Sequence, residues 1–243
     1  MTTQSAYSPT QSAFIHLRMH TEYSISDGIL QIPQALKGAE QDSMPALGIS
    51  DLMNLFGMVK FYKAARGKGI KPIIGADIWV SPAGAPDQAT RMLLICLNRE
   101  GYGQLCELIS RAFVENQHKG RASLLRDWLT QEACSGLIAL SGAMQGDVGQ
   151  HLLSGQDAAA AEAAQDWARR FPNRFYLEVQ RAGHPGTETY IRGALDLAEC
   201  LNLPVVATHP VQFYAAEDFM AHEARVCISQ GNILADKRRP KDF

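Results

Sequence analysis

The sequence lacks the cysteine pattern of disulfide-linked and zinc-binding proteins. Its five cysteines are scattered, odd in number, and include no C-x-x-C pair. Most of them stand in apolar runs, where a free cysteine behaves as a small core residue in a reducing compartment. No window approaches the roughly 20 apolar residues that a membrane span needs, and the first dozen residues contain no apolar signal core. We therefore predict a cytoplasmic protein without a membrane partner.

An excess of charge of one sign is also missing. The chain has 23 lysines and arginines against 25 aspartates and glutamates, which gives a formal net charge of -2 and a pI near 6.4. Such a balance creates no global attraction to nucleic acid or to an anionic membrane, so any nucleic-acid contact must be local. No G-x-G-x-x-G or G-x-x-x-x-G-K-[ST] follows a predicted strand, which leaves dinucleotide and P-loop sites without support.

What the sequence does contain is an alternation of apolar strands and helices. Hydrophobic patterning predicts strands at residues 15–24, 45–50, 71–80, 91–97, 136–141, 174–179 and 204–208. Helical periodicity predicts helices at residues 29–41, 105–113, 157–171 and 187–201, with a shorter one at 123–130. Leu55, Val59 and Tyr62 share the apolar face of a further helix. Strands joined through helices need crossover connections, so we expect a parallel sheet, either open and doubly wound or closed into a barrel.

Polar side chains end every predicted strand, and this pattern favours the barrel. They are His20, Asp51, Asp77, Asn98, Ser141, Glu178 or Gln180, and His209. The C-terminal strand ends of a parallel barrel build one rim, whereas an open sheet places its site at a single switch point. A rim that carries His, Asp and Glu indicates metal-assisted hydrolysis, in which a bound cation activates water and neutralises phosphate.

Four of these side chains, His20, Asp51, Asp77 and Glu178, are of metal-ligand type. Each of them also has a structural alternative. The histidine suits a hydrogen-bonded position on the rim, and Asp51 suits a helix N-cap. Asp77 suits a hydrogen bond at the strand edge, and Glu178 suits an ion pair with an arginine such as Arg18.

Several stretches carry a more specific resemblance. They are H-L-R-M-H-T-E-Y-S-x-x-D-G from His16, P-A-L-G-I-S-D-L-M-N-L-F-G-M-V-K-F-Y from Pro45, G-I-K-P-I-I-G-A-D from Gly69, L-S-G from Leu140, Y-L-E-V-Q from Tyr176 and P-V-V-A-T from Pro204. Together they resemble the N-terminal polymerase and histidinol phosphatase (PHP) domain of bacterial DNA polymerase III alpha subunits of the proteobacterial type. The resemblance implies a distorted (β/α)7 barrel over residues 14–243, a flexible tail at residues 1–13, and a chain that is a fragment of a longer polymerase.

The resemblance also implies a metal site, since active PHP domains hold up to three metal ions at their strand ends. This chain departs from their ligand set at Arg18, Leu52, Arg91, Ala143, Pro210 and Gln212. The ligands that could still bind a metal are His20, Asp51 and Asp77, and these cannot complete a closed shell. Two arginines repel cations and could pair with the rim carboxylates instead. We therefore predict a vestigial, metal-free rim with little or no phosphoesterase activity.

The same resemblance implies a function for the whole protein. The parent would be a template-directed DNA polymerase that uses Mg²⁺ and contacts DNA through modules beyond the basic ending at residues 238–243. This domain would support the rest of that chain and dock a separate proofreading exonuclease subunit. Two alternatives stay open at this point. One is an active metal-dependent phosphoesterase or 3′–5′ exonuclease. The other is a DNA-binding module built on Lys60, Lys63, Arg66, Lys68 and Lys71.

Overall fold

The computed structural model describes residues 14–236 and residue 238, so the predicted tail and most of the basic ending lie outside the described residues. The α-helices are α1 (Ile32–Gln41), α2 (Met58–Gly67), α3 (Arg99–Glu115), α4 (Asp147–Leu153), α5 (Asp157–Arg170), α6 (Thr187–Leu201) and α7 (Phe219–Gln230). The strands are β1 (Ala46–Ile49), β2 (Lys71–Ser81), β3 (Thr90–Cys96), β4 (Gln117–His118), β5 (Arg121–Ala122), β6 (Leu124–Leu125), β7 (Leu137–Leu140), β8 (Phe175–Gln180) and β9 (Val205–Thr208).

The main sheet follows the order β1-β2-β3-β7-β8-β9, with β6 paired to β2. Neighbouring strands are parallel except at β3, which is antiparallel to both β2 and β7. The expectation of a parallel sheet is therefore wrong at this strand. The turn after β2 contains no α-helix, and so short a connection can form only a hairpin. As a result, Arg91 at the start of β3 lies opposite Trp79 near the end of β2.

The predicted opening strand at residues 15–24 is wrong at its end, where Glu22–Ser24 forms the 3-10 helix η1, but its extended first part closes the sheet. The carbonyl oxygens of His16 and Met19 accept hydrogen bonds from β1 and from the residue after it, at 2.7 and 2.9 Å. On the other side, His20 N donates to Val211 O at 2.8 Å, next to the parallel bridge between Met19 and Val211. Extended backbone at residues 16–20 therefore joins β1 to the segment after β9, and the predicted distorted barrel is confirmed.

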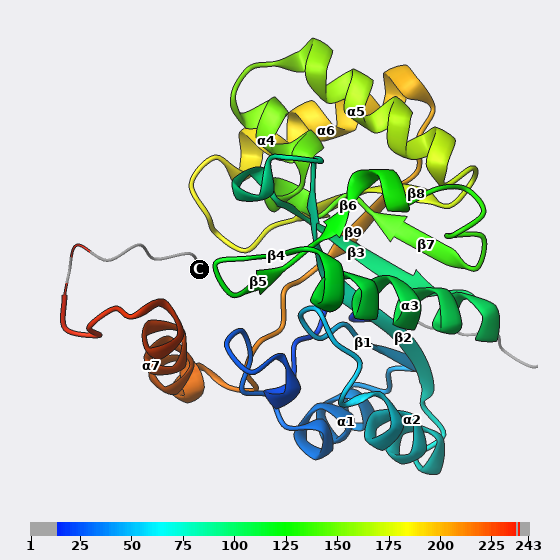
Figure 1. Ribbon diagram of the computed structural model, residues 1–243. Helices are drawn as coiled ribbons and strands as arrows, with labels where there is room; N and C mark the ends of the chain where they lie inside the picture. The colour runs from blue at the N-terminus through cyan, green and yellow to red at the C-terminus, as the bar shows by residue number, and fades with distance from the viewer. Residues whose placement is uncertain (1–13, 237, 239–243) are drawn as a thin grey trace, which may run out of the picture.

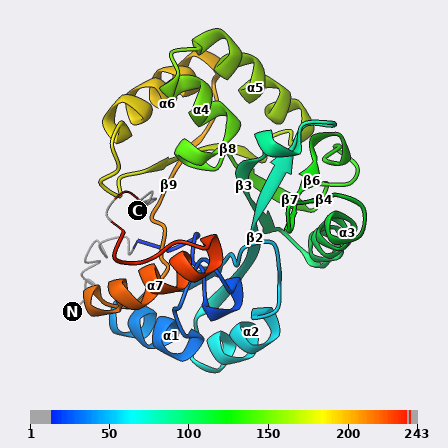
Figure 2. The ribbon, with the colours of Figure 1, turned by 60° about the vertical axis from the view of Figure 1, so that its left-hand side comes forward.

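Helices surround the strands in both views (Figures 1 and 2). The larger core cluster lies between the sheet and helices α3, α5 and α6, and includes Trp167, Phe171 and Phe175. A second cluster packs α1 and α2 on β1 and includes Phe61. The predicted face of α2 is wrong, because Val59 and Tyr62 are exposed while Phe61 is fully buried.

The predicted short helix at residues 123–130 is also wrong. Leu124 and Leu125 form strand β6 beside Val80 and Ser81 at the end of β2, and one turn of 3-10 helix follows at Arg126–Trp128. Leu124 is fully buried. Burial of this leucine beside β2 explains why pairing with the sheet prevails over helix formation in this segment.

A close approach of two backbones fixes the position of α3, and it yields a prediction. A Cβ on Gly101 would lie 1.8 Å from the carbonyl oxygen of Gly136, whereas a Cβ on Gly103 of the same helix would meet nothing within 4 Å. We expect Gly101→Ala to lower the free energy of unfolding by about 3 kcal/mol or more, because two backbone segments must separate. Gly103→Ala, the control, should raise it by about 0.5–1 kcal/mol. Urea denaturation measures both, and equal effects would contradict the packing described.

Candidate functional site

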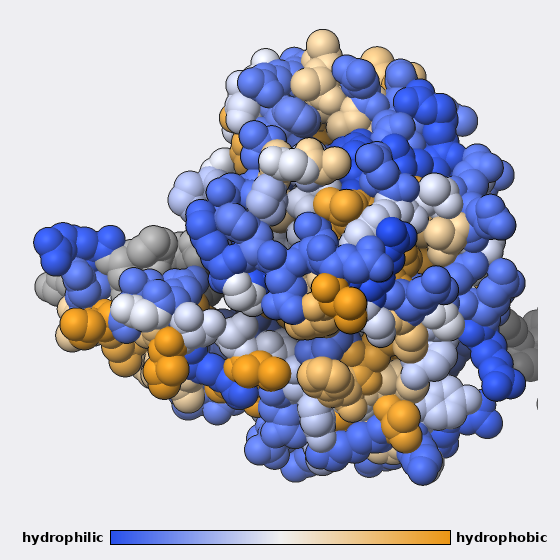
Figure 3. Space-filling model, viewed as in Figure 1, coloured by the Kyte–Doolittle hydropathy of each residue, from blue (hydrophilic) through white to orange (hydrophobic). Residues whose placement is uncertain are grey.

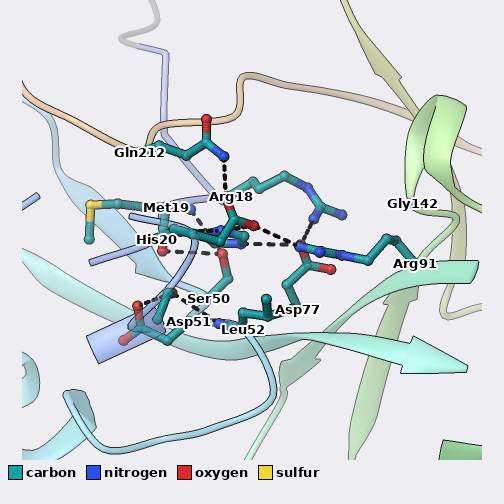
Figure 4. A network of polar contacts seen from close by, with 12 residues as sticks. Arg18, Met19, His20, Ser50, Asp51, Leu52, Asp77, Arg91, Gly142 and Gln212 are labelled. Carbon is teal, nitrogen blue, oxygen red and sulfur yellow. Dashed lines mark hydrogen bonds and ion pairs between the residues drawn. The ribbon is translucent and has the colours of Figure 1, made fainter. Parts of the chain in front are cut away.

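The centre of the barrel rim is occupied by the guanidinium group of Arg18. Its Nε and Nη2 atoms donate to the two carboxylate oxygens of Glu178, at 2.8 Å each, in a bidentate pair (Figure 4 shows the surrounding network). Its Nη1 atom donates to Asp77 Oδ2. Arg18 is 5% exposed, and both carboxylates are fully buried. Arg18 thus joins the opening strand to β2 and β8.

Arg91 is the second arginine at the rim and shares the same carboxylate oxygen. Its Nη2 atom donates to Asp77 Oδ2 and lies 3.4 Å from Asp27 Oδ2, and its guanidinium stacks on the Trp79 ring at 4.7 Å. Arg91 is the second residue of β3, and it reaches the rim because β3 runs antiparallel to β2. For the same reason Asn98, which follows β3, lies away from this rim and accepts the Gly101 N–H that begins α3.

His20 completes the group of cations. Its Nε2 atom is 3.1 Å from Asp77 Oδ2, and its Nδ1 atom is 3.1 Å from Asp27 Oδ2. Burial alone would lower the pKa of His20, but contact with Asp27 and Asp77 outweighs it and raises the pKa to about 9. The imidazole is therefore protonated at neutral pH.

The charges in this network balance. Three cations, Arg18, Arg91 and His20, face three carboxylates, Asp27, Asp77 and Glu178. Burial would raise the pKa of Asp77, but both arginines and His20 hold it far below the usual range. The pKa of Asp27 is lowered in the same way, chiefly by His20 acting against burial. We call these six side chains the rim network.

Glu178 is also held by neutral donors. Gly142 N and Gln180 Nε2 donate to its carboxylate at 3.1 Å each, and the Thr208 hydroxyl donates to Oε1. Ser141 Oγ accepts the backbone N–H of Glu178 at 3.0 Å. Glu178 therefore has the charge-assisted partners that a buried carboxylate requires.

Asp51 lies apart from the rim network, although the sequence places it among the ligands. Its carboxylate accepts hydrogen bonds from Thr21 N at 2.6 Å and from the hydroxyls of Thr21 and Ser24. Burial raises the pKa of Asp51, and these hydrogen bonds offset only part of the increase. Asp51 does not cap a helix, because α2 begins after Gly57.

The substituted positions have structural roles instead of ligand roles. Leu52 packs on the larger core cluster, and Ala143 is buried in a small cluster with Tyr190 and Ala194. Pro210 is partly buried just after β9. Gln212 donates from Nε2 to Asp27 Oδ1, and its carbonyl oxygen accepts Ile29 N at 2.8 Å. His209 lies 6.4 Å from the His16 ring and does not join the network.

Asp27 is the member of the network that sequence reasoning missed. It stands in the Ser26-Asp27-Gly28 turn, where an aspartate is common. Because the residue lies outside the predicted strands, strand periodicity gives no indication of where its side chain points. Gly28 has φ of 152°, and a Cβ at this position would lie 2.8 Å from the carbonyl oxygens of His20 and Thr21, so only glycine lets the turn fold back and bring Asp27 over His20. The useful signal was a carboxylate within the motif that begins at His16.

The donor set does not fit a metal centre. Within residues 14–236 and 238, no cluster of three or more His, Cys, Asp or Glu side chains is arranged to hold a metal ion. Asp77 Oδ1 lacks a hydrogen-bond partner there, but Oδ2 of the same carboxylate is shared by Arg18, Arg91 and His20. Guanidinium groups supply no lone pair and repel cations, so a shell of ligands cannot assemble around Asp77.

The raised pKa of His20 makes stability depend on pH. The folded pKa of about 9 exceeds the value of 6.5 that an imidazole has in an unfolded chain, so the protonated imidazole stabilises the fold fully below pH 6.5. This contribution is lost as the pH rises through 9. We expect the free energy of unfolding to fall by on the order of 3 kcal/mol between pH 6.5 and pH 10, measured by urea denaturation at several pH values.

Two variants separate this effect from other titrations. His20→Gln should remove most of the pH dependence in that window, because glutamine does not titrate. The control is His151→Gln on α4, where the side chain bonds to Gln156, and it should leave the dependence intact. A slope that persists unchanged in His20→Gln would contradict the assignment.

Comparisons with known proteins show which family this chain resembles in sequence. Residues 16–182 match the family model of the PHP domain. DNA polymerase III subunit alpha of Neisseria meningitidis serogroup A is 50% identical over 236 residues, which cover 96% of this chain and 21% of that protein. The Escherichia coli K12 subunit alpha is 43% identical over 234 residues, covering 96% and 20%. The chain therefore spans about a fifth of the length of these relatives.

Solved structures share the fold at low sequence identity. An amidohydrolase from Chromobacterium violaceum, with bound sulfate and no metal, gives a TM-score of 0.56 at 13% identity, covering 87% of this chain and 96% of that one. A Bacteroides vulgatus protein that contains a predicted PHP-like metal-dependent phosphoesterase gives a TM-score of 0.51 at 14% sequence identity. The match covers 82% of this chain and 52% of that one. With the matched residues spanning more than half of its length and its strands closed into the same kind of barrel, this chain belongs to the PHP domain family.

Proposed function

We propose that this chain is the PHP domain, over residues 14–243, of a replicative DNA polymerase of the DNA polymerase III alpha type, and that the domain is a metal-free structural barrel. The relatives support the parent function, since they are named as that subunit and are 43–50% identical. One observation carries the structural role: the Arg18 guanidinium binds Asp77 and Glu178, which are candidate metal ligands. DNA synthesis, with Mg²⁺ as its metal, would belong to the remainder of the polypeptide.

The partners follow from this proposal. The remainder of the alpha chain would rest on the barrel and contact DNA, and a separate proofreading exonuclease subunit would dock on it, in the cytoplasm. Among the described residues, no helix is both long enough and apolar enough to cross a bilayer. Primer extension by the full-length chain with Mg²⁺ tests the parent function directly, and no extension would contradict it.

The structural role predicts that Arg18 is essential for folding stability. Removing this charge leaves Asp77 and Glu178 buried without their main partner, which costs about 3–5 kcal/mol in comparable buried pairs. We expect Arg18→Met to lower the free energy of unfolding by that amount. Arg181→Met is the control, because Arg181 pairs with Glu188 at the surface, with 71% of its side chain exposed, and should change stability by less than about 1 kcal/mol. Equal losses in chemical denaturation would contradict the role.

An active phosphoesterase or 3′–5′ exonuclease is the enzymatic alternative. Metal analysis of the purified protein distinguishes it from the structural role. We expect the purified protein, equilibrated with Mn²⁺ and Zn²⁺ and then desalted, to keep far less than one metal ion per chain. Hydrolysis of a model phosphodiester with added Mn²⁺ should be unaffected by His20→Ala or Asp51→Ala. Stoichiometric metal together with hydrolysis lost in these variants would establish the enzyme instead.

The nucleic-acid alternative has less support from the structure. Lys60 lies 3.6 Å from Glu22 and stacks over the Tyr23 ring, and Lys68 pairs with Glu40 at 2.6 Å. Two of the five basic side chains are therefore already engaged by neighbours. A phosphate backbone would have to compete with these contacts.

A further inference from the structure

A band of exposed hydrophobic side chains crosses one face of the molecule. Hydrophobic side chains gather over α7 and continue across the lower part of this face toward α2 (Figure 3). The apolar band, as we define it, consists of Ile25, Phe56, Val59, Met220 and Ile228, which are 62, 69, 55, 57 and 81% exposed. Large apolar side chains that are exposed together mark interaction surfaces in soluble proteins, whereas single exposed ones do not.

Polar contacts hold the parts of the band together. Arg225 of α7 donates to the carbonyl oxygen of Ile25 and, at 3.4 Å, to that of Glu22. Asn54, two residues before Phe56, donates to Tyr23 O at 2.9 Å. The one-turn helix η1 (Glu22–Ser24) therefore connects α7 to the start of α2. These contacts fix the backbone that carries Ile25 against α7 and against the segment before α2.

The backbone at Ile25 adopts a strained conformation. Ile25 has φ of 62° and ψ of -66°, and Ser26 N donates to Ser24 O at 2.7 Å across it. This is the positive-φ form of the γ-turn, which is rare and is least favourable for a β-branched residue. Strain of this kind costs about 1–3 kcal/mol and concentrates at functional sites. The turn keeps a large apolar side chain in solvent.

Helix α7 has apolar side chains on more than one side. Cys227 is 3% exposed and faces the barrel, while Met220 and Ile228 point outward. His222 and Glu223 are buried on the inner side of α7 together with Cys227. The outer side of α7 therefore contributes two large exposed apolar side chains, Met220 and Ile228, to the band.

We propose that the apolar band is the surface on which the remainder of the longer polypeptide packs. This inference rests on the proposed function, since the relatives are about five times as long as this chain and about four fifths of such a polypeptide lies outside the structure. Permanent interfaces are more apolar than transient ones and resemble a divided core. A band of large aliphatic and aromatic side chains fits a permanent neighbour in the same chain better than a separate partner or a second copy.

Cysteine accessibility in the full-length chain tests the proposal. Phe56→Cys and Ile228→Cys would be labelled with a maleimide and read position by position by tandem mass spectrometry, which separates them from native cysteines. The control is Val114→Cys on α3, outside the band, where the side chain is 84% exposed. Each rate is compared with that of the urea-unfolded chain. We expect labelling at least tenfold slower at both band positions than at Val114→Cys.

Each alternative occupant gives a different result. Labelling at both band positions as fast as at Val114→Cys would overturn the proposal and leave the band to a separate partner. Protection that disappears on dilution to nanomolar protein would assign the band to a second copy, which also overturns it. Primer extension is measured on the same preparation. If the full-length chain does not extend a primer, the proposed parent function is wrong, and the labelling rates still report whether the band is covered.

Discussion

The structure depends on the compensation of one buried carboxylate oxygen, Asp77 Oδ2. Arg18, Arg91 and His20 all contact it; the first and last come from the opening segment and Arg91 comes from β3. An uncompensated charge at this depth would cost several kcal/mol, so the barrel is stable only when these segments are in place together. The network thereby couples the extended segment at residues 16–20 to β2, to β3 and, through Glu178, to β8. Electrostatic balance and closure of the barrel are parts of one constraint.

Much of this could be predicted from the sequence. All six strands predicted after the opening segment fall on observed strands. Strict period-two alternation fails in the opening segment, because His16 lies beside Met19 and away from the carboxylates that Arg18 and His20 contact. The pairing of Arg18 with Glu178 was among the structural alternatives, because a carboxylate on a strand end next to an arginine has few other uses. The strand positions are local features, which local periodicity determines, whereas the pairing followed from the charges of the two side chains.

The rest could not be predicted, because it depends on long-range geometry. The direction of β3 follows from the absence of a helix after β2, and this reversal alone brings Arg91 to the rim and takes Asn98 away from it. Asp27 joins the network only because a turn folds back over His20. Asp51 shares the residue type of a ligand, yet its neighbours Thr21 and Ser24 hold it elsewhere. On α2, periodicity assigned Val59 and Tyr62 to the core, and the structure exposes both.

The substitution of arginine for metal ligands also explains how a barrel of this family could dispense with metal without losing its shape. Arg18 and Arg91 together carry the charge of one divalent cation, so the pair supplies the positive charge that the buried carboxylates Asp77 and Glu178 need. Loss of metal with no such replacement would leave bare charges in the core. A guanidinium group, however, binds through fixed donors and cannot activate water, so a rim held by arginines keeps its cohesion without supplying metal chemistry. On the proposed structural role, the surfaces of the domain matter more than its rim, and the apolar band is the exposed surface of large hydrophobic side chains among them.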